Sequence, residues 1–535
     1  MHPLRAASMN YVGVEFPIEL GQFGLMADLS PDKIPIGALI HARNISINEG
    51  RIQKAAGAKT YNATALSGGI ISFYDWWPDT TTQRMLAATS DGFIYKDLGL
   101  GTFSAGAVAS GLGPLTPNCK FVSGGGESAG EVKKLFFFSF GKAQLKVMAG
   151  DGTSFASVAS PSTDWTTTNF PKVGVLHSNR LWAFAGQIAY ASDTGDHENF
   201  TSNNLVIPCF PGEGGDIIGA FVFKTKLFVF KEDSYGYVLD DSSLDSDDWI
   251  WRKFVSNFGI GAPNAIAEVL NDLLMGNSEG TCTSFNATNA LGDVDAGDLF
   301  NIAGVENWLR NNTAKVGVES RHMMYYPDKK LVFITYRNGY SVSNDMLIVI
   351  DFNKPNEPRI VTWKKGAPNC LGLRKDAAKI LRPMYGSSDG KLYSMDVEDR
   401  LEGATAYSGE FQTPHTNCGT TKAKSFDFLS VKYIPEGQHT LSCDYYIDGK
   451  YMDTITFPMA QYLDPQLNTL LLNTDRLANA QSPETATRAI GGSGRTISFK
   501  FYNSGSNESF QVAGLVVGFR SSGEQAQTAT GSEND

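Results

Sequence analysis

The sequence predicts an all-β protein: a β-propeller of six or seven blades, preceded by an N-terminal arm and followed by a C-terminal domain like a β-sandwich. Three observations lead to this fold class. Gly (55), Phe (33) and Tyr (20) are abundant, which suits short strands joined by tight turns. A strand–turn–strand unit recurs along the chain, and no long segment shows the 3.6-residue apolar period of a helix. We therefore expect only short helical segments, at 305–310 and 476–481.

The recurring unit is a short aromatic or aliphatic strand, a turn rich in Gly, Asp, Ser or Asn, and a second strand. Its copies begin at Met85, Leu135, Leu181, Leu227, Leu273, Leu331 and Met384. The four copies that begin between 135 and 273 are about 46 residues apart, and a four-stranded propeller blade takes roughly 40–50 residues. We interpret each copy as part of one blade. A row of separate sandwiches with unrelated hairpins is the alternative.

Changes in the pattern suggest four segments. Residues 1–47 show no clear alternation at their start and form the expected arm, and residues 48–397 hold the repeats. Residues 398–520 contain longer alternating strands, including a hairpin with a two-residue turn at Asp448-Gly449, and predict the C-terminal β-sandwich. Within that domain we expect 460–493 to be a loop. Residues 521–535 contain no apolar side chain larger than alanine, so a disordered tail is expected.

The charge and cysteine content narrow the function classes. Asp and Glu outnumber Lys and Arg by 56 to 45, giving a net charge of −11, and so acidic a chain is not expected to coat itself onto DNA or anionic membranes. The negative net charge is consistent either with a surface that is only required to be soluble or with the wall of a channel through which DNA passes without binding. The six cysteines are far apart and predict neither a zinc site nor a disulfide framework. We expect no signal peptide at the N-terminus, and the apolar segment 512–519 is too short to span a bilayer.

The search for chemistry yields few candidates. The chain lacks the H-E-x-x-H, G-x-S-x-G and Walker A motifs. The acidic stretches 240–248 and 293–298 faintly suggest calcium loops but lack the required Gly and Glu spacing, so solvated loops are expected. In a ring assembly the first stretch is a candidate acidic loop lining a channel, with its carboxylates at Asp240, Asp241, Asp245, Asp247 and Asp248. We assign no catalytic, cofactor-binding or metal-binding residue and expect no cofactor.

An enzyme is the least favoured class at this point. Propellers carry glycoside-cleaving sites, but such sites need convergent carboxylates or an activated tyrosine beside arginines, and no pattern marks such a group here. Residues 192–200 resemble a sialidase Asp-box with the wrong spacing, because Asp193 directly follows Ser192. The expectation from the sequence is that the chain is not an enzyme.

Residues 23–59 resemble the opening of the propeller-bearing tail proteins of short-tailed bacteriophages, which are the tail nozzle and packaged-DNA stabilisation proteins. The resemblance lies in spaced positions, namely Gly24-Leu25, Asp28, Ile34-Pro35-x-Gly37, Arg43-Asn44, Gly50-Arg51 and Lys54-x-x-Gly57. Residues 179–200 and 227–238 are similar to blades of that family, and 510–520 to its last strand. Residues 404–520 are similar to that family in the pattern of their strands more than in identical residues.

The resemblance implies a structural protein of the virion tail, assembled in the host cytoplasm. It implies a ring, usually of six copies, below the adaptor ring on the portal side, which closes the DNA channel, retains the packaged genome and anchors tail fibres or a tail tip. DNA would pass the lumen without specific binding, and no membrane insertion is implied. The alternatives are a glycan- or protein-binding propeller module and, less favoured, a glycoside-cleaving enzyme.

Overall fold

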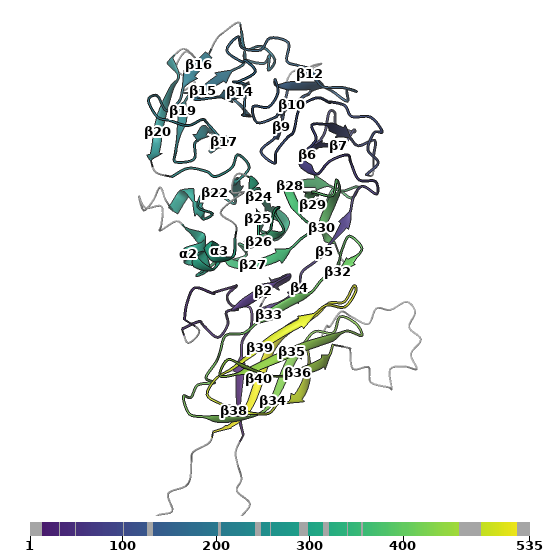
Figure 1. Ribbon diagram of the computed structural model, residues 1–535, viewed down its shortest axis with the longest axis vertical. Coiled ribbons are helices and arrows are strands. Elements are labelled where there is room, and N and C mark those ends of the chain that lie inside the picture. Colours follow the sequence, from purple (N-terminus) through teal and green to yellow (C-terminus); the bar gives the residue numbers. More distant parts are fainter. Residues whose placement is uncertain are drawn as a thin grey trace, which may run out of the picture. The chain divides into compact units, whose positions relative to one another are not determined.

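The structure is a computed structural model and describes residues 13–30, 33–48, 50–99, 101–125, 132–201, 205–240, 248–256, 258–287, 298–313, 320–339, 341–354, 357–397, 399–459 and 483–521. The chain divides into two compact units. One contains Ala56–Thr405, and the other combines Met1–Ala55 with Ala406–Asp535. In both, almost all of the described regular elements are β-strands (Figure 1).

The first unit is a β-propeller, which confirms the predicted fold class. Its described strands form seven consecutive antiparallel groups. The first three are β6 (Ile70–Trp76), β7 (Arg84–Thr89) and β8 (Ile94–Lys96); β9 (Lys120–Gly124), β10 (Lys134–Phe138), β11 (Lys146–Ala149) and β12 (Ala156–Ser157); and β13 (Val173–His177), β14 (Arg180–Ala185), β15 (Ile188–Ala191) and β16 (Leu205–Pro208). The next two are β17 (Gly219–Phe223), β18 (Lys226–Phe230), β19 (Ser234–Leu239) and β20 (Ile250–Ser256); and β21 (Ile266–Val269), β22 (Asp272–Gly276) and β23 (Cys282–Ser284). The last two are β24 (Met323–Tyr326), β25 (Leu331–Tyr336), β26 (Met346–Asp351) and β27 (Arg359–Lys364); and β28 (Pro368–Lys375), β29 (Leu381–Ser387) and β30 (Leu392–Val397).

The repeat seen in the sequence corresponds to these groups one for one. Each predicted copy begins within or beside the second strand of its group, from Met85 in β7 to Met384 in β29. Figure 1 shows the second or third strands β7, β10, β14, β19, β22, β25 and β29 following one another around a common centre. The near-regular spacing therefore reflects a ring of similar sheets rather than separate sandwiches.

A strand from the start of the unit completes the last sheet. β5 (Gly57–Thr60) pairs antiparallel with β30, with Tyr393 opposite Thr60 and Met395 opposite Ala58. The last and first groups also share a buried cluster that includes Ile70, Met384 and Leu392. The ring is thus closed by hydrogen bonds and by apolar packing between its last and first groups.

Apolar side chains between neighbouring sheets form the propeller core. Clusters join the first group to the second, the second to the third, the third to the fourth and the fourth to the fifth. Trp182 on β14 is fully buried, and its indole N–H donates to the His177 carbonyl at 3.2 Å. Burial of each large apolar side chain contributes about 1.5 to 3 kcal/mol, so these clusters are the main source of stability.

The second unit consists of two antiparallel sheets. One contains β3 (Ile45–Asn48), β4 (Arg51–Lys54), β40 (Gln511–Ser521), β34 (Lys424–Tyr433) and β37 (Glu484–Ala489), with β1 (Val14–Ile18) on β40 and β38 (Ser493–Gly494) on β34. The other contains β2 (His41–Arg43), β33 (Gly409–Gln412), β39 (Ile497–Asn503), β35 (Thr440–Ile447) and β36 (Lys450–Pro458). Burial alternates residue by residue along β35, as expected for a strand with one covered face.

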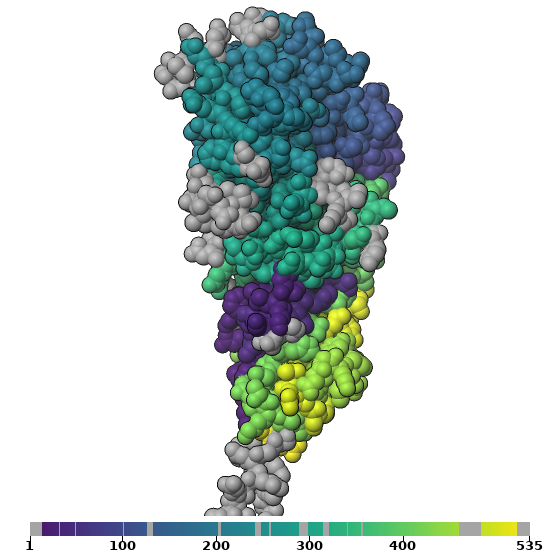
Figure 2. Space-filling model, turned by 60° about the vertical axis from the view of Figure 1, so that its left-hand side comes forward, coloured from purple at the N-terminus to yellow at the C-terminus, as the bar shows by residue number. Residues whose placement is uncertain are grey.

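The N-terminal segment differs from the predicted arm. Residues 13–30 and 33–48 are part of the second unit, because β1 pairs with β40 over five residues and β2 pairs with β33. The hairpin β3–β4 also belongs there, so the propeller unit begins at Ala56 rather than at 48. Figure 2 shows residues near both ends of the chain, purple and yellow-green, sharing the surface of this unit.

Smaller expectations have mixed outcomes. Helix α3 (Glu306–Asn312) confirms the short helix expected at 305–310, whereas 476–481 lies outside the described residues. β37 lies inside the segment 460–493 that was expected to be a loop, and 460–482 is not described. Of the predicted tail, only Ser521 is described, as the last residue of β40. All six cysteines are free and buried. Within the described ranges, no helix has the length and apolar character that crossing a membrane requires.

Candidate functional site

The first acidic stretch does not present Asp240 as a free carboxylate. Asp240 follows β19, and its side chain is 10% exposed. It accepts hydrogen bonds from His177 Nε2 and, at 3.0 Å, from Ser178 Oγ. Burial raises the pKa of this carboxyl, but the hydrogen bonds and the charge of His177 outweigh burial and lower the pKa overall. Asp240 therefore ties the end of β19 to the turn between β13 and β14.

The other carboxylates of the two acidic stretches give little further evidence. Asp248 is exposed, and Asp241, Asp245 and Asp247 lie outside the described residues. In the second stretch only Asp298 is described, and its carboxylate caps the short helix α2 (Leu299–Ile302) by accepting from the Phe300 N–H at 2.9 Å. Across the described part of the chain, no three His, Cys, Asp or Glu side chains are grouped to hold a metal ion.

The segment that resembled an Asp-box forms a structural turn. Ser192 is fully buried, and its hydroxyl accepts from the Leu181 N–H at 2.9 Å. Asp193 and Asn199 close the turn, since the Asn199 amide donates to the Asp193 carboxylate at 2.8 Å and the Asp193 N–H donates to the Asn199 carbonyl at 2.9 Å. Arg180 donates to the Ser192 carbonyl at 2.6 Å. These residues position one another, which explains their pattern without a catalytic role.

The spaced positions in 23–59 also have structural roles. The Asn44 amide, at φ +52°, donates to the Ser408 carbonyl at 2.7 Å. Lys54 is fully buried, with Nζ bonded to Asn503 Oδ1 at 3.1 Å. A Cβ atom at Gly57 would lie 2.3 Å from two backbone oxygens. This set of residues fixes backbone paths between segments that are distant in the sequence.

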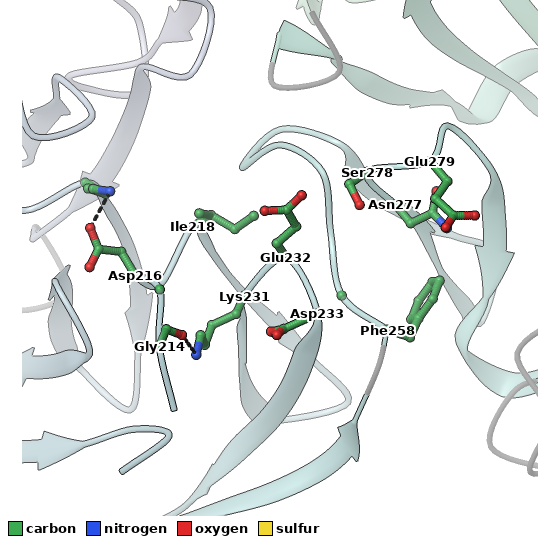
Figure 3. Close-up of a pocket in the computed structure, with 13 residues that line it drawn as sticks. Gly214, Asp216, Ile218, Lys231, Glu232, Asp233, Phe258, Asn277, Ser278 and Glu279 are labelled. Atoms are coloured by element: carbon green, nitrogen blue, oxygen red, sulfur yellow. Dashed lines mark hydrogen bonds and ion pairs between the residues drawn. The ribbon is translucent and has the colours of Figure 1, made fainter. Parts of the chain in front are cut away.

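A pocket of about 780 Å³ opens among loops of the propeller (Figure 3). We call it the loop pocket. Its lining comes from the segment before β13 and from the connections β16–β17, β18–β19, β20–β21 and β22–β23. The residues are Lys172, Gly214, Gly215, Asp216, Ile218, Lys231, Glu232, Asp233, Phe258, Gly259, Asn277, Ser278 and Glu279. Connections between propeller strands are free to vary without disturbing the sheets, so they are usual places for binding residues.

The loop pocket is acidic, with four carboxylates and two lysines in its lining. Both lysines are engaged: Lys172 pairs with Asp216 at 2.7 Å, and Lys231 donates to the Gly214 carbonyl, as the dashed lines in Figure 3 show. Glu232 and Glu279 are exposed and have no ion-pair partner among the described residues. Their carboxylates offer acceptors to a hydroxyl-bearing or cationic ligand.

A second pocket, of about 480 Å³, is lined mainly by residues on or just beside the first strands of five propeller groups. We call it the central pocket. Its residues are Ser72, Phe73, Tyr74, Asp75, Trp77, Cys119, Lys120, Phe121, Asn264, His322, Leu371, Gly372, Leu373, Lys375 and Leu381. Sequence reasoning found neither pocket, because the loop pocket draws residues from three groups of strands and the central pocket from five, and no spacing along the chain connects them.

Comparisons with known proteins assign no family. No family model matches the chain, and no curated protein matches it. Among solved structures, the computationally designed protein Ika8 is 11% identical, with a TM-score of 0.36, over 64% of this chain and 100% of its own. An exo-beta-1,3-galactanase from Phanerochaete chrysosporium is 8% identical, with a TM-score of 0.27, over 87% and 99%. The extracellular domain of a putative one component system from B. thetaiotaomicron is 11% identical, with a TM-score of 0.38, over 76% and 48%.

One of these comparisons corrects an expectation. The prediction that the chain is not an enzyme is wrong as an exclusion, because an exo-beta-1,3-galactanase is among the structures that the chain resembles. At such TM-scores the likeness assigns neither a substrate nor a reaction to this chain.

Proposed function

We propose that this chain is a structural protein of the tail of a short-tailed bacteriophage. In this proposal, copies of the chain form a ring around the DNA channel, retain the packaged genome and anchor fibres or a tail tip. The observation that carries the proposal is the set of spaced residues in 23–59 that resembles the tail nozzle proteins. Asn44, Lys54 and Gly57 of that set hold the chain in its architecture, so the resemblance concerns how the protein is built.

The charge of the chain supports this function. A wall past which DNA slides must not bind phosphate, and binding to phosphate grows with each lysine or arginine that neutralises the backbone. With 56 acidic and 45 basic residues, the chain has the sign of charge that such a wall needs.

An open strand edge supports assembly. β36 is the last strand of its sheet and forms a strand ladder only with β35 among the described residues, while Arg488 on β37 donates to its Thr456 carbonyl at 2.9 Å. Tyr451 and Met452 on this strand are 55% and 42% exposed. An exposed strand edge with apolar side chains is a surface that a neighbouring copy can extend or cover.

The proposal is tested by the mass of the full-length chain in solution. We expect mass photometry to find a closed oligomer, six copies being the number that the resemblance implies. The double substitution Tyr451→Glu with Met452→Glu should shift this population toward single chains. Val206→Glu, on an exposed position of β16 in the propeller unit, is the matched control and should leave the oligomer intact. A single-chain mass for the unsubstituted protein at every concentration would contradict the proposal.

The loop pocket favours a second candidate function, the binding of a hydroxyl-rich ligand such as a glycan. The carboxylates of Glu232 and Glu279, which form no ion pair with another described residue, line the same pocket as the ring of Phe258 (Figure 3). Carboxylates beside an aromatic ring suit a sugar. A glycan array probed with the labelled chain tests this function. Binding that is lost in Glu232→Gln with Glu279→Gln, but kept in Glu268→Gln, supports it. Unchanged binding in the double variant contradicts it.

A further inference from the structure

The central pocket lies where the propeller groups meet. β6, β9 and β28 contribute to its lining and are the first strands of their groups. Asn264 lies two residues before the first strand β21, and His322 directly precedes the first strand β24. β28 lies beside β6, β6 beside β9, and β24 beside β28. Five of the seven groups therefore converge on one cavity, whose volume of about 480 Å³ suits a small organic molecule.

Lys120, at the start of β9, brings a positive charge into this cavity. Its ammonium forms no ion pair or hydrogen bond with another described side chain, and its backbone pairs with Phe138 of β10. Burial alone lowers the pKa of its ammonium to about 8, so it remains mostly protonated at neutral pH. A desolvated cation without a counter-ion is unfavourable, and an anion in the cavity would relieve that cost.

His322 adds a hydrogen-bond donor. Its Nδ1 accepts the Leu371 N–H at 3.3 Å. Burial, and then the charge of Lys120, lower the pKa of the imidazole to about 3. The ring is therefore neutral with its proton on Nε2, and this N–H has no partner among the described residues. Lys120 and His322 thus offer one charged and one neutral donor to the same ligand.

The remaining titratable groups of the lining do not neutralise Lys120. Asp75 on β6 forms no ion pair with Lys120, and its carboxylate instead accepts from the Gln83 amide at 2.7 Å and the Lys375 N–H at 3.1 Å. The other titratable side chains that line the cavity are Tyr74, Cys119 and Lys375. Burial raises the pKa values of Tyr74 and of Cys119, the latter to about 12, so both are neutral. Lys375 is exposed and adds a second positive charge at the cavity.

The walls of the cavity are largely aromatic. Phe73, Tyr74, Trp77 and Phe121 line it. Gly372 makes room for one of these rings, because a Cβ atom there would lie 2.7 Å from Phe73. The cavity therefore combines cationic and N–H donors with flat apolar walls, as a ligand with an acidic headgroup and a ring or apolar body requires.

We propose that the central pocket binds a small organic anion, whose carboxylate or phosphate is held by Lys120 and His322 and whose body packs against the aromatic walls. This inference is independent of the proposed tail function. It concerns a site that residues from five groups build together and that no motif reveals.

The experiment measures binding of small probes to the full chain by isothermal titration calorimetry. Benzoate and phenyl phosphate are the anionic probes, and benzyl alcohol is the neutral one. We expect an anion to bind and benzyl alcohol to bind at least about tenfold more weakly, since only the anion meets the charge of Lys120. Affinity should fall about tenfold per pH unit above pH 8, as Lys120 loses its proton. Preference for benzoate or for phenyl phosphate identifies the headgroup, and failure of both to bind overturns the proposal.

Lys120→Met and Lys375→Met separate the two lysines of the lining. Lys120→Met should abolish anion binding, whereas Lys375→Met should change it less than threefold. Equal anion binding by Lys120→Met and the unsubstituted chain overturns the proposal. A second measurement uses the unsubstituted chain. The rate of acetylation of Lys120, followed by mass spectrometry, should increase as the pH rises through about 8 and should decrease when the anion is bound. Labelling of Lys120 that no anion slows also overturns the proposal.

Discussion

Gly57→Ala is expected to destabilise the propeller. Gly57 begins β5, the strand that completes the last sheet. Its N–H donates to the Asp399 carbonyl at 2.9 Å. A Cβ atom at this position would lie 2.3 Å from the Asp399 oxygen, 2.3 Å from the Leu401 oxygen and 2.7 Å from the Leu401 nitrogen. All three are backbone atoms, so no side-chain rotation relieves the clash, and we expect a loss of about 3 kcal/mol, the upper end of typical overpacking costs.

The assay is equilibrium unfolding in urea, with Gly106→Ala as the matched control. Gly106 lies in the same unit, and a Cβ atom there would meet nothing within 4 Å, so the control should stay within about 0.5 kcal/mol of the unsubstituted chain. Equal stability of Gly57→Ala and Gly106→Ala would refute the reasoning, since β5 would then not lie against 399–401.

Three further predictions follow from the buried titratable groups. Asp240→Asn should lower the free energy of unfolding at pH 7 by about 1.5 kcal/mol, because the charged hydrogen bond to His177 is lost. The pKa of Asp240 in the folded chain is lowered below 3.8. In urea unfolding, the difference in stability between the variant and the unsubstituted chain should therefore vanish as the pH falls through that pKa. Burial lowers the pKa of His322 from 6.5 to about 3, so the unfolded chain takes up the proton first and stability should fall by up to about 1.4 kcal/mol per pH unit below 6.5. His322→Gln should flatten this part of the pH profile, and an unaltered slope would show that other groups cause it. The six cysteines are free and buried, so Ellman's reagent should label them only after denaturation, and rapid labelling of the native chain would contradict their burial.

The repeat made the propeller predictable because it reports local structure. Each copy contains the second strand of a group and the turn beside it, and hairpin turns and alternating apolar residues are encoded within about a dozen residues. Leu135, Leu181 and Leu227 illustrate this, since each begins or nearly begins the apolar run of β10, β14 or β18 and all three are fully buried. The number of groups was harder to predict, because β21–β23 and β6–β8 have only three described strands each.

Pairings between distant parts of the chain were not predictable from these patterns. β1 pairs with β40, and β5 pairs with β30, over separations of several hundred residues. Short strands such as β2 carry too few residues to show an alternating pattern, and their partners are chosen by the packing of the whole unit. The prediction of a separate N-terminal arm was therefore wrong, because the strands of this segment complete sheets whose other strands lie near the C-terminus.

The pockets escaped prediction for a related reason. Lys120 and His322 are about 200 residues apart, and nothing near either residue marks it as part of a site. Asp240 shows the opposite error, because a run of acidic residues suggested a solvated loop while its first member is paired with His177. Charge in a sequence locates titratable groups but does not say which of them the fold neutralises.

Cryo-electron microscopy of the purified full-length chain tests the proposed function most directly. The tail-ring proposal predicts particles in which several copies surround an open axis, each copy showing a propeller whose last sheet includes a strand from 57–60. Particles that each hold one copy, with no rotational symmetry at any protein concentration, would contradict it.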